Sequence, residues 1–236
     1  MSYPYIPLVD CDSIAYSASG SVKEGEPVNY ALQNAKKSME SIQDKFDRGL
    51  EMKVYLTGTG NFREQIAVTQ PYKGNRTAPK PLYLPDVRQY LIDMWGAVVI
   101  DGKEADDAVC IQYLKDPEHQ CIVSIDKDLD QVPGYHYNYR KDLFYEVSEA
   151  EGERAFYLQL LMGDRTDHIK GIPGIGKAKA PRLLEGCRSS RDMYEVCKQQ
   201  YALAYPGNWE EVLNEHADLL FMWRKEDDKW QPPSSR

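Results

Sequence analysis

The chain has 236 residues, a hydrophobic content of 42% and a net charge of −8. This length suits one large domain, or one domain with a smaller lobe, and no apolar stretch is long enough to span a bilayer. The N-terminus lacks the basic segment of a secretory signal peptide, and the five cysteines have no CxxC spacing. We therefore expect a reduced, cytoplasmic protein without a zinc site or a disulfide framework.

Strands and helices are predicted to alternate over residues 1–148. In chain order we expect a strand at Ile6–Asp10, a helix at Asn29–Leu50, a strand at Lys53–Thr57, helices at Phe62–Val68 and Pro85–Trp95, a strand at Ala97–Ile100, a helix at Glu104–Tyr113, a strand at Cys121–Ile125, and a hairpin of His136–Tyr139 with Leu143–Val147. Such alternation predicts an α/β fold with a mostly parallel sheet and right-handed crossovers.

Residues 149–236 are predicted to be helical. The apolar spacing indicates helices at Ala150–Met162, Ala178–Leu184, Arg191–Tyr201 and Trp209–Phe221. Residues 70–85 are rich in Pro, Lys and Gly without an apolar period, so we interpret them as an ordered loop or arch.

Acidic residues follow three of the predicted strands. They are Asp10 and Asp12; Glu104, Asp106 and Asp107; and Asp126 and Asp128. Each group alone is commonly explained by a helix start or a turn. However, the carboxyl ends of parallel strands meet at one edge of a sheet, and alternation would place Asp10 and Asp12 on the same strand face. The joint pattern favours a site for a hard divalent cation, which prefers oxygen ligands.

A glycine hairpin, GDRTDHIKGIPGIGKAKA, carries two more acidic residues, Asp164 and Asp167, at its start. Its glycines suit a tight turn that approaches a ligand closely, and backbone N–H groups there can bind phosphate. The apolar Ile172 and Ile175 are expected to anchor the hairpin. A plain helix–turn–helix is the alternative interpretation.

The segment YKGNR, residues 72–76, places two cations close together in a polar loop. A solvated loop without function is the simpler reading. In the functional reading, Lys73 and Arg76 neutralise the charge that develops on a phosphate during its cleavage. The acidic net charge argues against nucleic-acid binding. The basic residues in this segment and after the hairpin weaken that argument.

Taken together, these motifs resemble the 5′-nuclease superfamily, the flap endonucleases and 5′→3′ exonucleases with a PIN-like domain. LVDCD, FREQIAVTQPYKGNR, KEADDAV, SIDKDLDQV and the glycine hairpin carry the resemblance, which runs from about Pro7 to Leu184. The size is similar to that of phage-encoded 5′→3′ exonucleases. The resemblance implies a PIN-like α/β core at 1–148 with a gateway segment at about 61–85, and a helical helix–hairpin–helix lobe at 149–236.

The resemblance also implies roles for individual residues. One Mg²⁺ or Mn²⁺ would be held, directly or through neighbouring groups, by Asp10, Glu104, Asp106, Asp107, Asp126 and Asp128, and a second by Asp164 and Asp167; we add Asp12 to the first set from its place beside Asp10. Lys73 and Arg76 would be catalytic. DNA contacts would come from Arg63, Tyr72, Gly171, Gly174, Gly176, Lys177 and Lys179, with a K⁺ ion at the hairpin.

The function implied is metal-dependent 5′→3′ exonuclease or flap endonuclease activity on duplex DNA with 5′ ends or flaps, or on RNA–DNA hybrids. The protein is expected to act as a monomer in the cytoplasm, that of the host if it is phage-encoded. Two alternatives are a catalytically inactive DNA-structure-binding protein of the same fold and a PIN-type ribonuclease.

The sequence departs from the family pattern at two positions. Thr57 stands where the family has an Asp after the second strand, and His168 stands where an Asn is usual. We expect Asp12 to compensate for Thr57 at the metal site, and His168 to alter DNA affinity more than chemistry.

Overall fold

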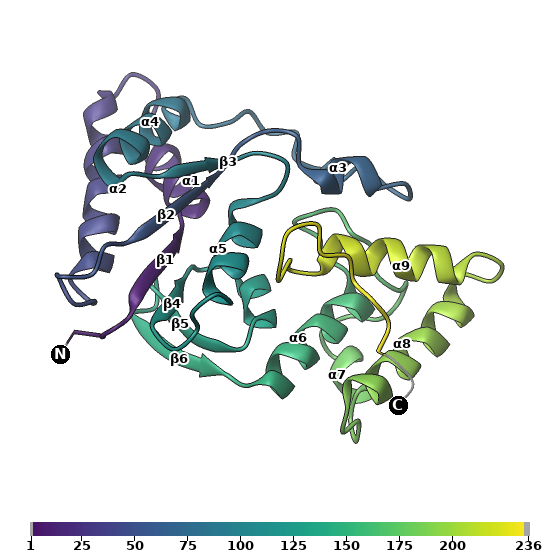
Figure 1. The fold of residues 1–236 in the computed structure, drawn as a ribbon. Coiled ribbons are helices and arrows are strands. Elements are labelled where there is room, and N and C mark those ends of the chain that lie inside the picture. Colours follow the sequence, from purple (N-terminus) through teal and green to yellow (C-terminus); the bar gives the residue numbers. More distant parts are fainter. Residues whose placement is uncertain (1, 234–236) are drawn as a thin grey trace. The chain divides into compact units, whose positions relative to one another are not determined.

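The computed structural model describes residues 2–233. It contains a six-stranded sheet with strands β1 (Ile6–Asp10), β2 (Lys53–Thr57), β3 (Val98–Ile100), β4 (Gln120–Val123), β5 (Gly134–Asn138) and β6 (Leu143–Val147). The strand order is β3-β2-β1-β4-β5-β6 (Figure 1). The pairs β1–β2, β1–β4, β2–β3 and β4–β5 are parallel. The predicted α/β fold with a mostly parallel sheet is confirmed.

The helices follow the predicted order with one addition. They are α1 (Asp12–Gly20), α2 (Val28–Gln43), α3 (Phe62–Ile66), α4 (Leu84–Trp95), α5 (Ala105–Tyr113), α6 (Glu149–Met162), α7 (Ala180–Leu183), α8 (Ser190–Ala204) and α9 (Trp209–Leu220). A short 3-10 helix covers Lys127–Gln131. Helix α1 is not among the predicted helices. Within the described residues no helix is both long and apolar enough to cross a membrane.

The chain forms two compact units. Unit 1 comprises residues 1–61, 78–129 and 134–146, and unit 2 comprises 62–77, 130–133 and 147–236. Residues 62–77 of the gateway segment thus belong to the helical unit, whereas its residues 78–85 belong to unit 1, which differs from a single division after residue 148. Hydrogen bonds explain why residues 130–133 also belong to unit 2: the Gln131 side-chain amide donates to Gln159 Oε1 at 2.6 Å and to the Leu220 carbonyl at 2.8 Å.

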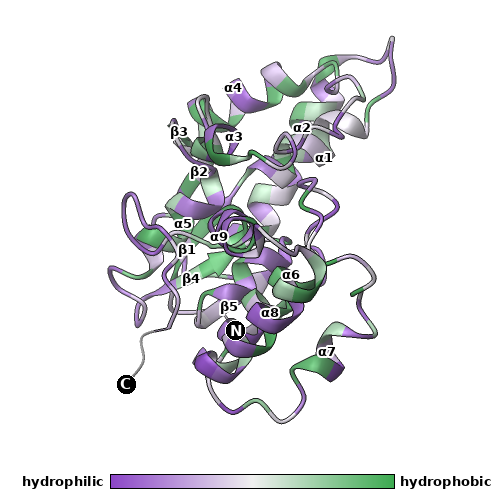
Figure 2. Cartoon of the chain, turned by 90° about the vertical axis from the view of Figure 1, so that its right-hand side faces the viewer, coloured by the Kyte–Doolittle hydropathy of each residue, from purple (hydrophilic) through white to green (hydrophobic). Residues whose placement is uncertain are grey.

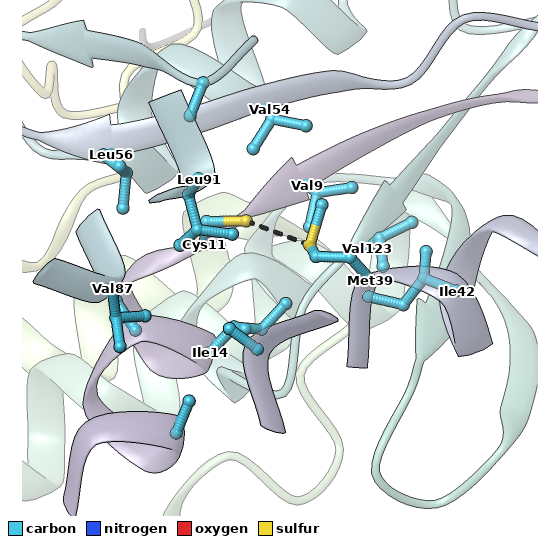
Figure 3. Packing of buried hydrophobic residues seen from close by; sticks show 14 of the residues in the cluster. Val9, Cys11, Ile14, Met39, Ile42, Val54, Leu56, Val87, Leu91 and Val123 are labelled. Carbon is cyan, nitrogen blue, oxygen red and sulfur yellow. Dashed lines mark hydrogen bonds between the residues drawn. The ribbon is translucent and has the colours of Figure 1, made fainter. Parts of the chain in front are cut away.

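The core of unit 1 lies between the sheet and α1, α2 and α4. Val9, Val54, Leu56 and Val123 from the strands meet Ile14, Met39, Ile42, Val87 and Leu91 from these helices (Figure 3). At its centre the Cys11 thiol lies 3.6 Å from the Met39 sulfur. Helix α5 packs against β1, β2 and β4 outside this cluster. Because both faces of the central strands are covered, β4 is buried throughout and is coloured as hydrophobic in Figure 2.

The core of unit 2 is built from α6, α8 and α9 together with the glycine hairpin. Ile172 and Ile175 are buried among residues of these helices, which confirms their predicted anchoring role. Helix α8 shows both hydrophilic and hydrophobic colour in Figure 2, and buries Met193, Cys197 and Tyr201. All five cysteines are free thiols in the structure.

Candidate active site

Asp10 ends β1 and lies at the acidic edge of unit 1. Its side chain is only 7% exposed. It accepts hydrogen bonds from the Asp12 N–H at 3.1 Å and from the Ser124 hydroxyl at 3.2 Å. Burial, assisted by the nearby Asp12 and Asp126, raises the pKa of Asp10 to about 7. A carboxylate in these surroundings is stabilised by a bound cation.

Asp12 does not share a strand face with Asp10, because it is the first residue of α1. Its carboxylate turns to the end of β2 instead. It accepts the Thr57 N–H, at 3.2 Å to each oxygen, and pairs with Arg88 of α4 at 3.2 Å. Arg88 also donates to the Thr57 carbonyl at 2.6 Å. The expectation of a shared face was wrong because the strand ends at Asp10 and the chain turns into a helix at once.

The acids after β3 lie at the start of α5. Glu104 and Asp107 form a capping box, in which the Glu104 N–H donates to Asp107 Oδ2 at 3.3 Å. The Asp107 N–H donates to Asp106 Oδ1 at 2.6 Å. The Thr57 hydroxyl accepts the Ala105 N–H at 2.9 Å, and so ties the end of β2 to the same helix start. Satisfying helix N–H groups is the ordinary task of acids at this position.

The acids after β4 are linked to Asp10 through Ser124. The Ser124 hydroxyl accepts the Asp126 N–H at 3.1 Å, and Asp126 Oδ1 accepts the Asp128 N–H at 3.0 Å. Asp128 also lies 3.4 Å from the Lys127 ammonium. The ends of β1 and β4 therefore meet at one edge of the sheet, as the parallel topology requires.

The chemistry of these side chains fits a hard cation, since all the candidate ligands are oxygens and Asp10 is buried beside other acids. However, among residues 2–233 no group of three or more His, Cys, Asp or Glu side chains is assembled closely enough to hold a metal ion. The case for a divalent cation at this edge therefore rests on the oxygen ligands and on the buried carboxylate of Asp10.

In unit 2, residues 71–76 contact the loop that precedes the hairpin. Asp167 Oδ1 lies 2.9 Å from Arg76 Nη2 and 3.7 Å from Lys73 Nζ, and its Oδ2 accepts the Tyr72 hydroxyl at 2.7 Å. Asp164 is buried and accepts the N–H groups of Thr166 and Asp167 at 2.6 and 3.2 Å. The structure thus brings together two cations and two acids from these predicted sites. Lys73 and Arg76 pair with Asp167, and Asp164 shapes the loop through its hydrogen bonds.

The hairpin glycines have different surroundings. Gly163 and Gly171, both with positive φ, lie so close that a Cβ on Gly171 would be 2.1 Å from the Gly163 nitrogen. Gly174 also has a positive φ, but it and Gly176 have open space around the Cβ position. Lys177 and Lys179 are exposed. A hollow of about 460 Å³ next to the hairpin is lined by Asn75, Met162, Asp164, Arg165, His168, Ile169, Lys170, Ile172, Pro173, Gly174 and Ile175.

Two of the residues predicted to contact DNA are buried in the structure. The Arg63 side chain is fully buried and donates to the carbonyls of Leu219 and Phe221 at 2.9 and 3.1 Å. Tyr72 is 8% exposed and lies in the core of unit 2, with its hydroxyl on Asp167. In the structure both side chains serve packing and hydrogen bonding, and their contacts with DNA stay predictions.

Sequence reasoning missed Ser124 and Arg88. Ser124 lies two residues before Asp126, in the position where a strand ends, and this offers a weak signal for a residue at the acidic edge. Arg88 lies on an amphipathic helix, 31 positions from Thr57, whose carbonyl it binds. No local pattern predicts that contact.

No protein-family model matches the chain. In sequence it is similar to a 5′-3′ exonuclease of Bacillus subtilis, with 32% identity over 148 residues, 54% of this chain and 49% of the relative. It is 30% identical to a flap endonuclease of Shewanella baltica over 131 residues, 50% of each protein. It is 26% identical to a thermostable DNA polymerase I of Thermus thermophilus over 213 residues, 81% of this chain and 25% of the relative. The chain thus spans half or less of these curated relatives.

Solved structures show the same fold. A bacteriophage T5 5′-exonuclease with bound zinc ions gives a TM-score of 0.63 at 19% identity, covering 92% of this chain and 87% of that one. A bacteriophage T5 flap endonuclease, in a pseudo-enzyme–product complex with DNA and metal ions, gives a TM-score of 0.59 at 14% identity, covering 92% and 99%. The chain thus shares the fold of these two bacteriophage T5 nucleases, and it combines that fold with acids at one edge of a parallel sheet and a glycine hairpin.

Proposed function

We propose that this chain is a divalent-metal-dependent 5′ nuclease, which hydrolyses phosphodiester bonds near 5′ ends or flaps of duplex DNA. The observation that carries the proposal is the acidic edge of unit 1 on a 5′-nuclease fold, centred on the buried Asp10. Relatives named 5′-3′ exonuclease and flap endonuclease support the same activity.

The cation would be held by Asp10 and Asp126, with Asp128 joined to Asp126 through its N–H and Glu104 at the start of α5. We propose Mg²⁺ or Mn²⁺ because the ligands are carboxylates. When bound, such an ion lowers the pKa of a water and stabilises the oxygens of a phosphodiester under attack. The protein's own contribution is to hold Asp10 rigidly through the Asp12 N–H and the Ser124 hydroxyl, so that the ligand oxygens keep their positions.

DNA binding is proposed for unit 2. The exposed Lys177 and Lys179 follow the hairpin, and Lys73 and Arg76 lie beside the loop before it. Lysine, arginine and open backbone at Gly174 suit phosphate contacts, which bind duplex without reading its sequence. We further propose that the chain acts on RNA–DNA hybrids and binds K⁺ at the hairpin. We also propose that it is a monomer in the cytoplasm.

The test is the digestion of 5′-end-labelled duplex and flap DNA in Mg²⁺. We expect wild type to release short 5′ products, and Asp126→Ala to lose at least about a hundredfold in rate, the scale seen when one electrostatic contributor is removed. Lys73→Ala should also be slower. Asp93→Ala, which removes an exposed acid of α4, is the matched control and should cleave like wild type.

A second candidate function is DNA-structure binding without cleavage. Thr57 favours it, because this residue holds the Ala105 N–H and contributes no carboxylate. Tight binding of forked DNA with no cleavage in Mg²⁺ or Mn²⁺ would support this candidate and exclude the nuclease.

A further inference from the structure

Residues 71–76 and 164–168 of unit 2 are joined along their lengths. The Lys73 N–H donates to the Asp167 carbonyl at 2.9 Å, and the Asn75 side-chain amide donates to the Arg165 carbonyl at 2.7 Å. His168 Nδ1 lies 3.1 Å from the Pro71 carbonyl. Lys73 and His168 both adopt left-handed backbone, with φ of 54° and 64°. Non-glycine residues rarely adopt this conformation without support, so the two segments are firmly set against each other.

The Asp167 side chain makes contacts that are separate from those that join the two segments. Its carboxylate lies against both cations of the segment, Lys73 and Arg76, and accepts the Tyr72 hydroxyl. A carboxylate facing a guanidinium and an ammonium occupies the place that a phosphate takes in other proteins, because the two anions accept the same charge-assisted hydrogen bonds.

The exposure of these side chains makes the pairing exchangeable. The side chains of Lys73, Arg76 and Asp167 are 23%, 48% and 18% exposed. An incoming anion can therefore reach the cations. The Lys73 N–H bond to the Asp167 carbonyl and the Asn75 side-chain bond to the Arg165 carbonyl do not use the Asp167 carboxylate. That carboxylate can therefore turn away while the two segments stay joined.

We propose that Asp167 is an internal competitor for the nucleic-acid phosphate at Lys73 and Arg76. In the DNA-free protein its carboxylate occupies these two cations, and a DNA phosphate binds them only by displacing it. This inference rests on the proposed function, because it requires that the chain bind DNA. It assigns Asp167 a role in setting DNA affinity that is separate from metal binding.

The experiment measures the binding of fluorescently labelled flap DNA by anisotropy, in EDTA so that no divalent cation takes part. Asp167→Asn keeps the size and one acceptor for Tyr72 but removes the competing charge. We expect this variant to bind DNA about three- to tenfold more tightly than wild type, the range of a partly exposed ion pair. Thermal unfolding checks that the variant is folded.

Glu215→Gln is the matched control. Glu215 accepts hydrogen bonds from the N–H groups of Val68 and Thr69, both at 2.7 Å, and so holds the residues just before segment 71–76 without an ion pair to Lys73 or Arg76. The substitution changes the net charge equally, and it should leave DNA affinity within about twofold of wild type, as expected for a charge not facing the phosphate.

A double-variant comparison checks that the gain comes from the cations. Lys73→Met should cost more affinity in the Asp167→Asn background than in wild type, because only there is Lys73 already released. Equal affinities of wild type and Asp167→Asn, or the same gain in Glu215→Gln, would overturn the inference alone. No DNA binding by wild type or by either variant would overturn the proposed function as well.

Discussion

At the scale of single residues, the acidic edge contains acids with different tasks. Asp126 raises the pKa of the buried Asp10, and within residues 2–233 neither acid forms an ion pair, whereas Asp12 pairs with Arg88 and accepts the Thr57 N–H. The expected compensation, in which Asp12 replaces the missing acid at position 57, is hard to combine with this geometry. Asp12 instead holds the backbone of Thr57 through the Thr57 N–H.

This difference predicts opposite effects for two isosteric substitutions. Asp12→Asn should lower the free energy of unfolding by about 1–3 kcal/mol, because Arg88 loses a charged partner. It should leave Mn²⁺ affinity nearly unchanged. Asp126→Asn should keep stability and weaken Mn²⁺ binding at least about tenfold, since a charged ligand is lost.

Urea unfolding and calorimetric Mn²⁺ titration measure the two quantities. Arg88→Met is the control for Asp12→Asn and should reproduce its loss of stability. An Asp12→Asn variant that loses as much Mn²⁺ affinity as Asp126→Asn would show that Asp12 is a ligand after all.

Residue positions at strand ends could be predicted from the sequence, because parallel strands bring their carboxyl ends to one edge. The partners of these residues could not. Arg63 has the spacing of a surface residue on a short helix, yet its guanidinium binds carbonyls 156 and 158 positions away. Such long-range contacts leave no periodic trace in the sequence.

At the scale of elements, the strands β1, β2 and β6 agree with their predicted bounds, since short apolar runs between turns mark buried strands clearly. Helix α1 was missed because serines and small residues dilute its apolar spacing. Helix α2 ends at Gln43 and not at Leu50, because Phe46, which fits the helical spacing, bridges to Tyr3.

The end of α6 and the hairpin provide a prediction at this scale. Gly171→Ala should lower the free energy of unfolding by at least about 3 kcal/mol, because the new Cβ would collide with the backbone of Gly163. Gly174→Ala should cost only about 1 kcal/mol, since its positive φ is strained but its surroundings are open.

Chemical denaturation of both variants separates these costs. The pair shares one hairpin and one substitution, so each serves as the other's control. Equal losses of stability would mean that backbone conformation alone, and not the close approach of Gly163, determines which glycine is required.

At the scale of the whole molecule, stability depends on a buried histidine in the core of unit 2. His216 is 2% exposed, and its Nδ1 lies 2.9 Å from the Tyr201 hydroxyl. Burial lowers the pKa of His216 to about 4. The folded protein therefore keeps this histidine neutral at a pH where the unfolded chain protonates it.

The sign of the pH effect follows. Below the unfolded pKa of about 6.5 the unfolded state binds the additional proton, so the free energy of unfolding falls as pH decreases from 6.5 to 4, by roughly 3 kcal/mol in all. Urea unfolding at several pH values should show this slope in wild type and a flatter one in His216→Gln. His119→Gln is the control, because its exposed side chain pairs with Asp116, which raises its pKa and gives the opposite sign. An unchanged slope in His216→Gln would assign the effect to other groups.

The chain passes between the two units five times, at 61/62, 77/78, 129/130, 133/134 and 146/147. During synthesis from the N-terminus, Arg63 leaves the ribosome more than 150 residues before the carbonyls that bind it. Unit 2 therefore completes its structure only after nearly the whole chain has been made, and the nascent segment 62–77 waits without its partners. For the same reason, unit 2 cannot be exchanged between relatives as one continuous gene segment: a transplant of 147–236 alone would leave residues 62–77 behind.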